Sequence, residues 1–202
     1  YIDQYTTMFT SEDSGRDGKK IIYAGYKDEK AVISSGVVLK NWASADSEFS
    51  GVKGVYKIKL PEGIDDIFCL YEDNKRAVPA RYPNLLNGYP QYLELATGTN
   101  STGLQAKVNR NDLPVGADYS YAQMVVWPGS HNDGQMQFDW YSSVNPIVSY
   151  NLTSAVFRLK LPTWWDITVG NRYYIQNVKQ FLDVPGEFFY DRDTRFIYYK
   201  PF

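Results

Sequence analysis

Aromatic side chains are the residues of this sequence best suited to ligand binding: 18 Tyr, 10 Phe and 5 Trp occur among 202 residues. Tyr and Trp rings offer an apolar face for stacking and a polar edge for hydrogen bonds, which suits a sugar ring. We therefore predict carbohydrate binding by residues in or beside one central stretch, namely Trp127, His131, Tyr141, Trp164 and Trp165. The alternative for any one of these rings is packing in a hydrophobic core, which we expect for Trp140 with Met136 and Phe138.

His131 is the single histidine and lies in a predicted loop. It could act as an acid or base with Asp133 or Asp139, or simply be an exposed loop residue. Glycoside hydrolysis usually requires a pair of carboxylates. Asp139, Asp166, Asp183 and Glu187 are candidates, but no separation can be read from sequence, so the catalytic residues stay unknown. One His and one Cys give no zinc ligand set, and we expect neither a metal nor a cofactor.

Charge and cysteine content narrow the function classes. The net charge of -2 gives no basic excess for nucleic acid or an anionic membrane, and the longest apolar runs are too short to span a membrane. Cys69 has no internal disulfide partner, so we expect a buried free thiol, with an intermolecular disulfide as the alternative. The chain starts at Tyr1 with neither a signal peptide nor an initiator Met, which fits a mature, processed product or a trimmed chain. We expect a secreted protein. Asn100 and Asn151 head N-glycosylation triplets.

Short alternating runs predict an all-β fold. Strands are expected over 20–26, 31–34, 55–60, 135–140 and 155–159, and a hairpin over 187–199 with a polar turn. The best helical candidate is a single turn at 178–182. Segments 41–54 and 98–119 are rich in turn formers, and we expect them to be the least ordered.

Two motifs carry a family resemblance. The first is Arg81, Tyr82, Pro83 and Asn84; the second begins at Asn171 and Arg172 and includes Asn177. With the segment at 9–42, they resemble the N-terminal portion of right-handed parallel β-helix proteins of the secreted glycoside hydrolase or polysaccharide lyase type. The resemblance implies a partial right-handed β-helix, formed by 1–42 and 171–202, around an inserted antiparallel β-sandwich or barrel at 43–170.

These motif residues also have a local physical role. Pro83 favours an extended Tyr82, and Arg81 could bond carbonyl groups left free where strands splay apart. Asn177 follows an apolar strand and could bond its own backbone in a turn. The motifs therefore predict architecture and not catalysis.

The resemblance also implies a function. Active-site residues of such proteins lie on later coils, so we expect an extracellular carbohydrate-recognition or scaffold fragment that binds a polysaccharide or glycan and is not catalytic on its own. One alternative is a subunit or fragment of a glycoside hydrolase whose catalytic coils lie outside this chain. Another is a structural protein that polymerises through open β edges, with another chain or copy completing the β-helix, joined through Cys69.

Overall fold

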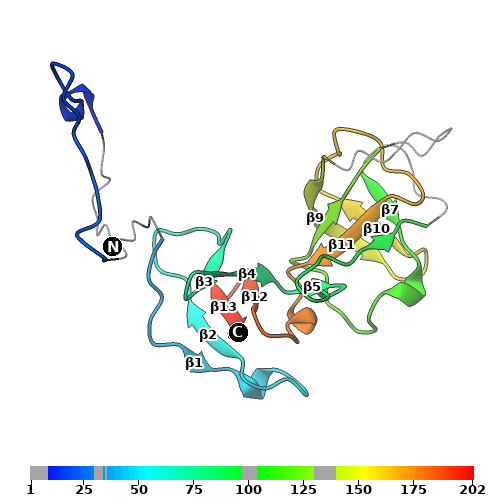
Figure 1. Ribbon diagram of the computed structural model, residues 1–202. Helices are drawn as coiled ribbons and strands as arrows, with labels where there is room; N and C mark the ends of the chain where they lie inside the picture. The colour runs from blue at the N-terminus through cyan, green and yellow to red at the C-terminus, as the bar shows by residue number, and fades with distance from the viewer. Residues whose placement is uncertain (1–8, 30–33, 35, 97–103, 130–139) are drawn as a thin grey trace. The chain divides into compact units, whose positions relative to one another are not determined.

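The computed structural model describes residues 9–29, 34, 36–96, 104–129 and 140–202 (Figure 1). The chain divides into two compact units, Tyr1–Lys40 and Asn41–Phe202. In the first unit a single 3₁₀ turn, η1 (Ser11–Asp13), is capped by Thr10, whose hydroxyl accepts the Glu12 N–H. The strand expected at 20–26 is not formed, and most of the strand expected at 31–34 lies outside the described residues.

The second unit holds two sheets. The six-stranded sheet has the order β1-β2-β13-β12-β4-β3. Its strands are β1 (Ala43–Ser44), β2 (Tyr56–Lys59), β3 (Leu70–Glu72), β4 (Lys75–Pro79), β12 (Glu187–Asp191) and β13 (Phe196–Lys200). The predicted hairpin is confirmed as β12 and β13, and the strand predicted at 55–60 is confirmed as β2. Segment 41–54, expected to lack order, forms β1 and the 3₁₀ turn η2 (Asp46–Glu48).

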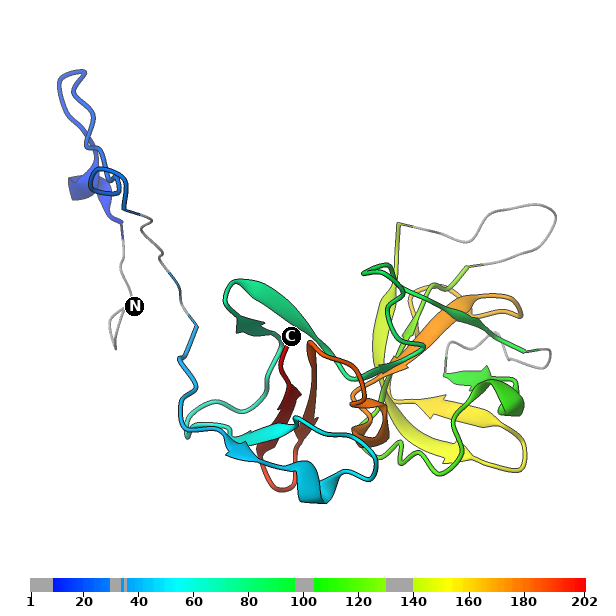
Figure 2. The same cartoon turned by 60° about the horizontal axis from the view of Figure 1, so that its bottom comes forward.

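The second sheet curls on itself and is named the barrel sheet here (Figure 2). Its strand order is β5-β11-β8-β9-β10-β7, and β6 also pairs with β11. The strands are β5 (Arg81–Tyr82), β6 (Leu93–Glu94), β7 (Gln105–Lys107), β8 (Gln123–Val126), β9 (Ser143–Asn151), β10 (Val156–Leu159) and β11 (Arg172–Gln176). Beyond β6, Leu95 N–H donates to the Asn171 carbonyl at 3.0 Å and Ala96 N–H to the Lys107 carbonyl at 2.8 Å. These bonds connect β11 to β7, so they join opposite sides of the curl.

Side chains that alternate along each strand point inward and fill the inside of the barrel sheet. Tyr173 and Ile175 of β11 are fully buried, while Arg172, Tyr174 and Gln176 lie on the outer face. On β10, Phe157 and Leu159 point inward, and with Ala155 they form the buried face that the sequence predicted. Phe189 and Tyr198 of the six-stranded sheet belong to the same core, so both sheets share one hydrophobic interior.

The chain connects the two sheets in a particular way. β4 and β12 are parallel neighbours, with Val78 opposite Glu187, and the whole barrel sheet lies between them in the sequence. Every other pair among the described strands is antiparallel. The all-β expectation is therefore confirmed. A right-handed β-helix is not shown by these strands, and the boundaries at 43 and 170 stay predictions.

The structure also bears on Cys69, on the helical turn predicted at 178–182 and on segment 98–119. Cys69 is exposed, so the expectation of a buried thiol is wrong; it lies outside β3, where the apolar run 67–71 reaches the edge of its sheet. The predicted helical turn at 178–182 is the 3₁₀ turn η5 (Lys179–Phe181). Another 3₁₀ turn, η3 (Arg110–Asp112), lies in segment 98–119, which was expected to be among the least ordered. In the described part of the chain, no helix is long and apolar enough to cross a membrane.

Candidate functional site

Four aromatic rings meet at one end of the barrel sheet, and we name them the surface aromatic cluster: Trp140, Tyr141, Trp164 and Trp165. Trp165 is the centre, with ring centroids 4.9 Å from Tyr141, 5.5 Å from Trp140 and 6.4 Å from Trp164. The first pair precedes β9 and the second follows β10. The paired course of these two strands brings residues over twenty positions apart into contact.

The cluster keeps much of its aromatic surface in water. Trp164 is 81% exposed and Trp140 is 74% exposed. The expectation that Trp140 packs in the core is therefore wrong. The alternation that predicted it runs through 135–139, which lie outside the described residues, and Trp140 itself follows that run as a turn residue. Gathered exposed apolar rings on a soluble surface are typical of a binding site.

Buried polar groups hold the backbone beside the cluster. Asn171, which is fully buried, donates through Nδ2 to the Gly129 carbonyl at 3.0 Å and accepts the Thr168 N–H at Oδ1, 2.8 Å away. Thr168 Oγ1 donates to the same Gly129 carbonyl, and Gly129 N–H donates to the Asp166 carbonyl. The loop that carries Trp164 and Trp165 is thus tied to the end of β8, which fixes the base of the cluster.

Trp127 belongs to a different group of rings. It lies 4.9 Å from Tyr92 and 6.1 Å from Tyr174 between ring centroids, on the outer face of β8 and β11. The Arg172 guanidinium lies 4.8 Å from the Trp127 ring and 5.1 Å from the Tyr92 ring, and that of Arg81 lies 3.5 Å from the Tyr174 ring. We name these five residues the arginine–aromatic stack. Cation–π contacts of this kind stabilise a surface locally.

Arg81 is a structural member of this stack. Its Nε donates to the Pro83 carbonyl and its Nη2 to the Gln91 carbonyl, each at 2.9 Å. Only 5% of Arg81 is exposed, and burial lowers the pKa of its guanidinium. The first motif therefore positions the chain where β5 ends. Asn84 of the same motif donates to Asp183 Oδ1 at 2.9 Å, which links the two motif regions.

Asn177 and Glu187 form the junction between the two sheets. Asn177 has a φ of 58°, and its N–H donates to the Ala80 carbonyl at 2.8 Å. Its side chain accepts the Tyr190 N–H at 3.0 Å and donates to the carbonyls of Tyr121 and Tyr190. It therefore bonds β12 and the segment before β8 together, a longer reach than the local turn expected from sequence.

Glu187 is 1% exposed and accepts backbone N–H groups from both sides of the junction. Arg81 N–H reaches Oε1 at 3.3 Å, and Asp183 N–H reaches Oε2 at 3.4 Å. Burial, and after it the charge of Asp183, raises the pKa of Glu187 to about 8. The carboxyl is thus held in place by the backbone it joins.

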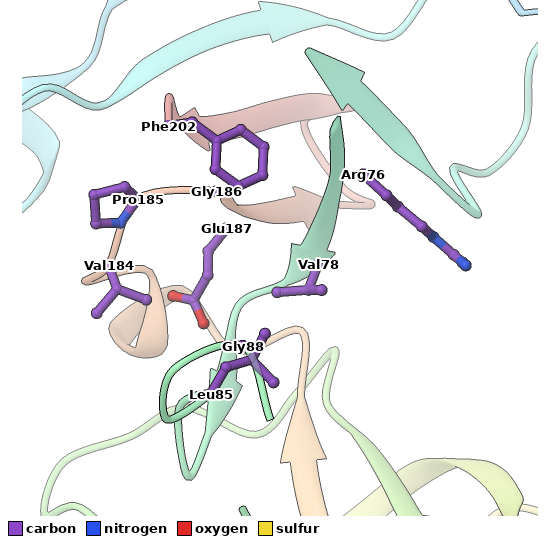
Figure 3. A pocket seen from close by; sticks show the side chains of 9 residues that line it. All are labelled: Arg76, Val78, Leu85, Gly88, Val184, Pro185, Gly186, Glu187 and Phe202. Carbon is purple, nitrogen blue, oxygen red and sulfur yellow. The ribbon is translucent and has the colours of Figure 1, made fainter. Parts of the chain in front are cut away.

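A pocket of about 310 Å³ opens beside Glu187 (Figure 3). Its wall is mainly apolar, with Val78, Leu85, Val184, Pro185 and Phe202, and the Arg76 guanidinium points away from Glu187. The Glu187 carboxyl oxygens are both used by backbone donors. We therefore assign Glu187 a structural role, and the pocket contributes no pair of catalytic carboxylates.

The remaining candidates belong to neither aromatic group or lie outside the described residues. His131, Asp133, Asp139 and Asn100 lie outside the described residues. Asn151 is exposed at the end of β9, where its Oδ1 accepts the N–H groups of Thr153 and Ser154 in the turn that follows. Among the described residues, no group of three or more His, Cys, Asp or Glu side chains is placed to hold a metal ion.

The structure thus brings together Tyr141, Trp164 and Trp165 of the predicted set and separates Trp127 from them. Sequence reasoning missed Trp140 as an exposed ring, and it missed the partners of Trp127, which are Tyr92, Tyr174 and the two arginines. The outward positions of Tyr174 and Arg172 on one strand were the available signal.

Comparison with known proteins shows a likeness in fold. A solved structure described as "Glycoside hydrolase" aligns with 87% of this chain at a TM-score of 0.54 and 20% sequence identity. The chain spans 30% of the length of that structure. No protein-family model and no curated protein matches the sequence. The likeness supports a glycoside hydrolase-like all-β fold for this chain.

Proposed function

We propose that this chain is a carbohydrate-recognition part of a glycoside hydrolase-like protein and is not catalytic on its own. The observation that carries the proposal is the surface aromatic cluster: Trp164 and Trp140 are mostly exposed, and Asn171 bonds Gly129 to Thr168, three residues after Trp165. Rings that already lie together lose less conformational entropy when a sugar stacks on them.

The fold is consistent with this role. The chain aligns with part of a larger protein described as a glycoside hydrolase. The parallel pair β4 and β12 is the place where a right-handed β-helix coil would begin, with the barrel sheet as its inserted module. We also propose that the protein is secreted and that Asn151 carries a glycan. The alternative of a hydrolase whose catalytic coils lie outside this chain shares the same recognition surface.

Isothermal titration calorimetry with soluble xylan, mixed-linkage β-glucan and dextran tests the proposal. We expect binding to at least one of them, and an affinity loss of about tenfold in Trp164→Ala, because one stacked ring contributes about 1 kcal/mol beyond its buried area. Tyr89→Ala is the matched control, because Tyr89 is 74% exposed and belongs to neither aromatic group. The proposal fails if neither these polysaccharides nor polygalacturonate and dextran sulfate bind, or if both variants weaken binding equally.

A second candidate function, assembly through an open edge, is favoured by one observation. β3 is an edge strand, and Phe68, Cys69 and Tyr71 are exposed there, with Phe68 at 85%. Pairing of two copies at this edge would cover these residues and place two Cys69 thiols near each other. Light scattering with and without reductant tests it, and a strict monomer at all concentrations would remove it.

A further inference from the structure

Half of the barrel sheet carries basic residues without acidic ones. The segments 95–111 and 140–165 supply β7, β9 and β10 and contain neither Asp nor Glu, although the chain as a whole has 23 acidic residues and a net charge of -2. The basic residues in these two segments are Lys107, Arg110, Arg158 and Lys160.

Three of these side chains lie on neighbouring strands. Arg158 and Lys160 are exposed and alternate with the buried Phe157 and Leu159, so both point away from the core. The pairing of β10 with β9 shifts register between Arg158 and Leu159, so the spacing of the two side chains is not that of a regular strand. On β7, Lys107 is paired with Val156, two residues before Arg158, which puts its side chain on the same outer face. We name Lys107, Arg158 and Lys160 the basic strip.

The basic strip leads to the surface aromatic cluster. Lys160 N–H donates to the Pro146 carbonyl at 2.9 Å, which keeps the chain paired with β9 one residue beyond β10. Leu161 follows at 59% exposure, and Trp164 comes three residues later at 81%. Neither Arg158 nor Lys160 forms an ion pair with a described residue. Their charges are therefore available to a ligand on the rings.

We propose that this surface selects an anionic glycan, in which sugar rings stack on the surface aromatic cluster and carboxylate or sulfate groups contact the basic strip. The inference rests on the proposed function and adds its ligand class. Charges on an exposed strip add moderate affinity, and this gain falls with salt. Each exposed ion pair strengthens binding by up to about fivefold and is screened over about 10 Å at 0.1 M salt.

The test compares charged and neutral forms of one backbone with the full 202-residue chain. Polygalacturonate is paired with its fully methyl-esterified form, and dextran sulfate with dextran, in calorimetric titrations at low and high salt. We expect at least a fivefold preference for the charged member of one pair at low salt, lost at high salt. The pair that shows the preference tells carboxylate from sulfate.

The double variant R158Q/K160Q should bring the preference for the charged member close to one while leaving neutral binding unchanged. The control K53Q/K59Q removes the same charge from exposed positions near and on β2, and it should keep the preference. An equal loss of this preference in both double variants would show that it depends on net charge alone and would overturn the inference.

The outcomes separate this inference from the proposed function. Neutral binding without any charged preference overturns the anionic class alone. Absence of binding to all four polysaccharides and also to xylan and mixed-linkage β-glucan overturns both. Binding of a single-stranded oligodeoxynucleotide as tight as that of the charged glycan would show a general polyanion surface and would also overturn the assignment.

Discussion

The junction and the surface aromatic cluster differ both in the kind of residue they use and in its exposure to water. At the junction, Asn177 and Glu187 are buried, and their polar atoms bond backbone groups of the same chain. At the cluster, Trp140 and Trp164 leave most of their surface to water. The difference teaches that the motifs which indicated a family are committed to architecture, whereas the rings outside those motifs are the ones open to a ligand.

The largest effect on stability is expected at Asn177. Asn177→Ala should lower the free energy of unfolding by about 3 kcal/mol, because it leaves the buried Tyr190 N–H and the Tyr121 carbonyl without their partner. Urea unfolding measures the loss. Asn177→Gly keeps the positive φ available, so a loss of similar size there would assign the effect to the hydrogen bonds, and full stability in both variants would contradict the junction as described.

Glu187 should give the junction a distinctive pH dependence. Its pKa is raised from 4.5 to about 8 in the folded chain, so between these values the folded state holds a proton that the unfolded state has released. Stability should then fall as pH rises from about 4.5 to about 8, by up to about 1.4 kcal/mol per pH unit, with no further loss from this group above that range.

Thermal unfolding across pH 5–8 checks this slope. Glu187→Gln should flatten it, whereas Asp183→Asn should leave most of it, because burial is the larger cause of the shift and the Asp183 charge is the smaller one. An unchanged slope in Glu187→Gln would assign the pH dependence to other groups.

A smaller effect is expected in the arginine–aromatic stack. Arg172→Gln removes a guanidinium from the rings of Trp127 and Tyr92 and should cost about 1 kcal/mol of stability. Arg76→Gln, at an exposed position on β4, provides the comparison and should cost much less. A loss of stability as large as that of Asn177→Ala would contradict this prediction, because it would show that the stack supports the fold as strongly as the junction does.

The smallest effect on stability is expected at Trp164. Trp164→Ala should change the free energy of unfolding by less than about 0.5 kcal/mol, because most of the ring is already in water. Its effect should instead appear in glycan affinity. A large stability loss with unchanged binding would reverse the comparison and make the cluster a structural element.

The sequence predicted those elements whose signals lie close together along the chain. The hairpin of β12 and β13 was predictable because alternation and its turn lie within fifteen residues. The parallel pairing of β4 with β12 was not, since it joins positions more than a hundred residues apart. The curl of the barrel sheet depends on Leu95 and Ala96, which carry no strand signal and act through backbone bonds.

The candidate site shows the same division. Trp164 and Trp165 could be singled out because adjacent strand-like rings cannot both face one core. Trp140 could not, because the alternation before it favoured burial. The role of Glu187 was also hidden, because its bond to Arg81 spans 106 positions and the residue looks in sequence like an ordinary strand acid.

The hydrogen bond from Asn177 to the Ala80 carbonyl has a consequence for how the fold tolerates changes in the length of the barrel sheet's loops. Ala80 follows β4, where the chain leaves the six-stranded sheet, and Asn177 follows β11, where the chain returns toward that sheet. The segment from Arg81 to Gln176 therefore begins and ends at one backbone contact. Lengthening, shortening or exchanging such a segment changes the closure entropy only slowly with its length. Changes in the length of its loops should therefore cost little stability, provided that its core keeps its packing against Phe189 and Tyr198 of the six-stranded sheet.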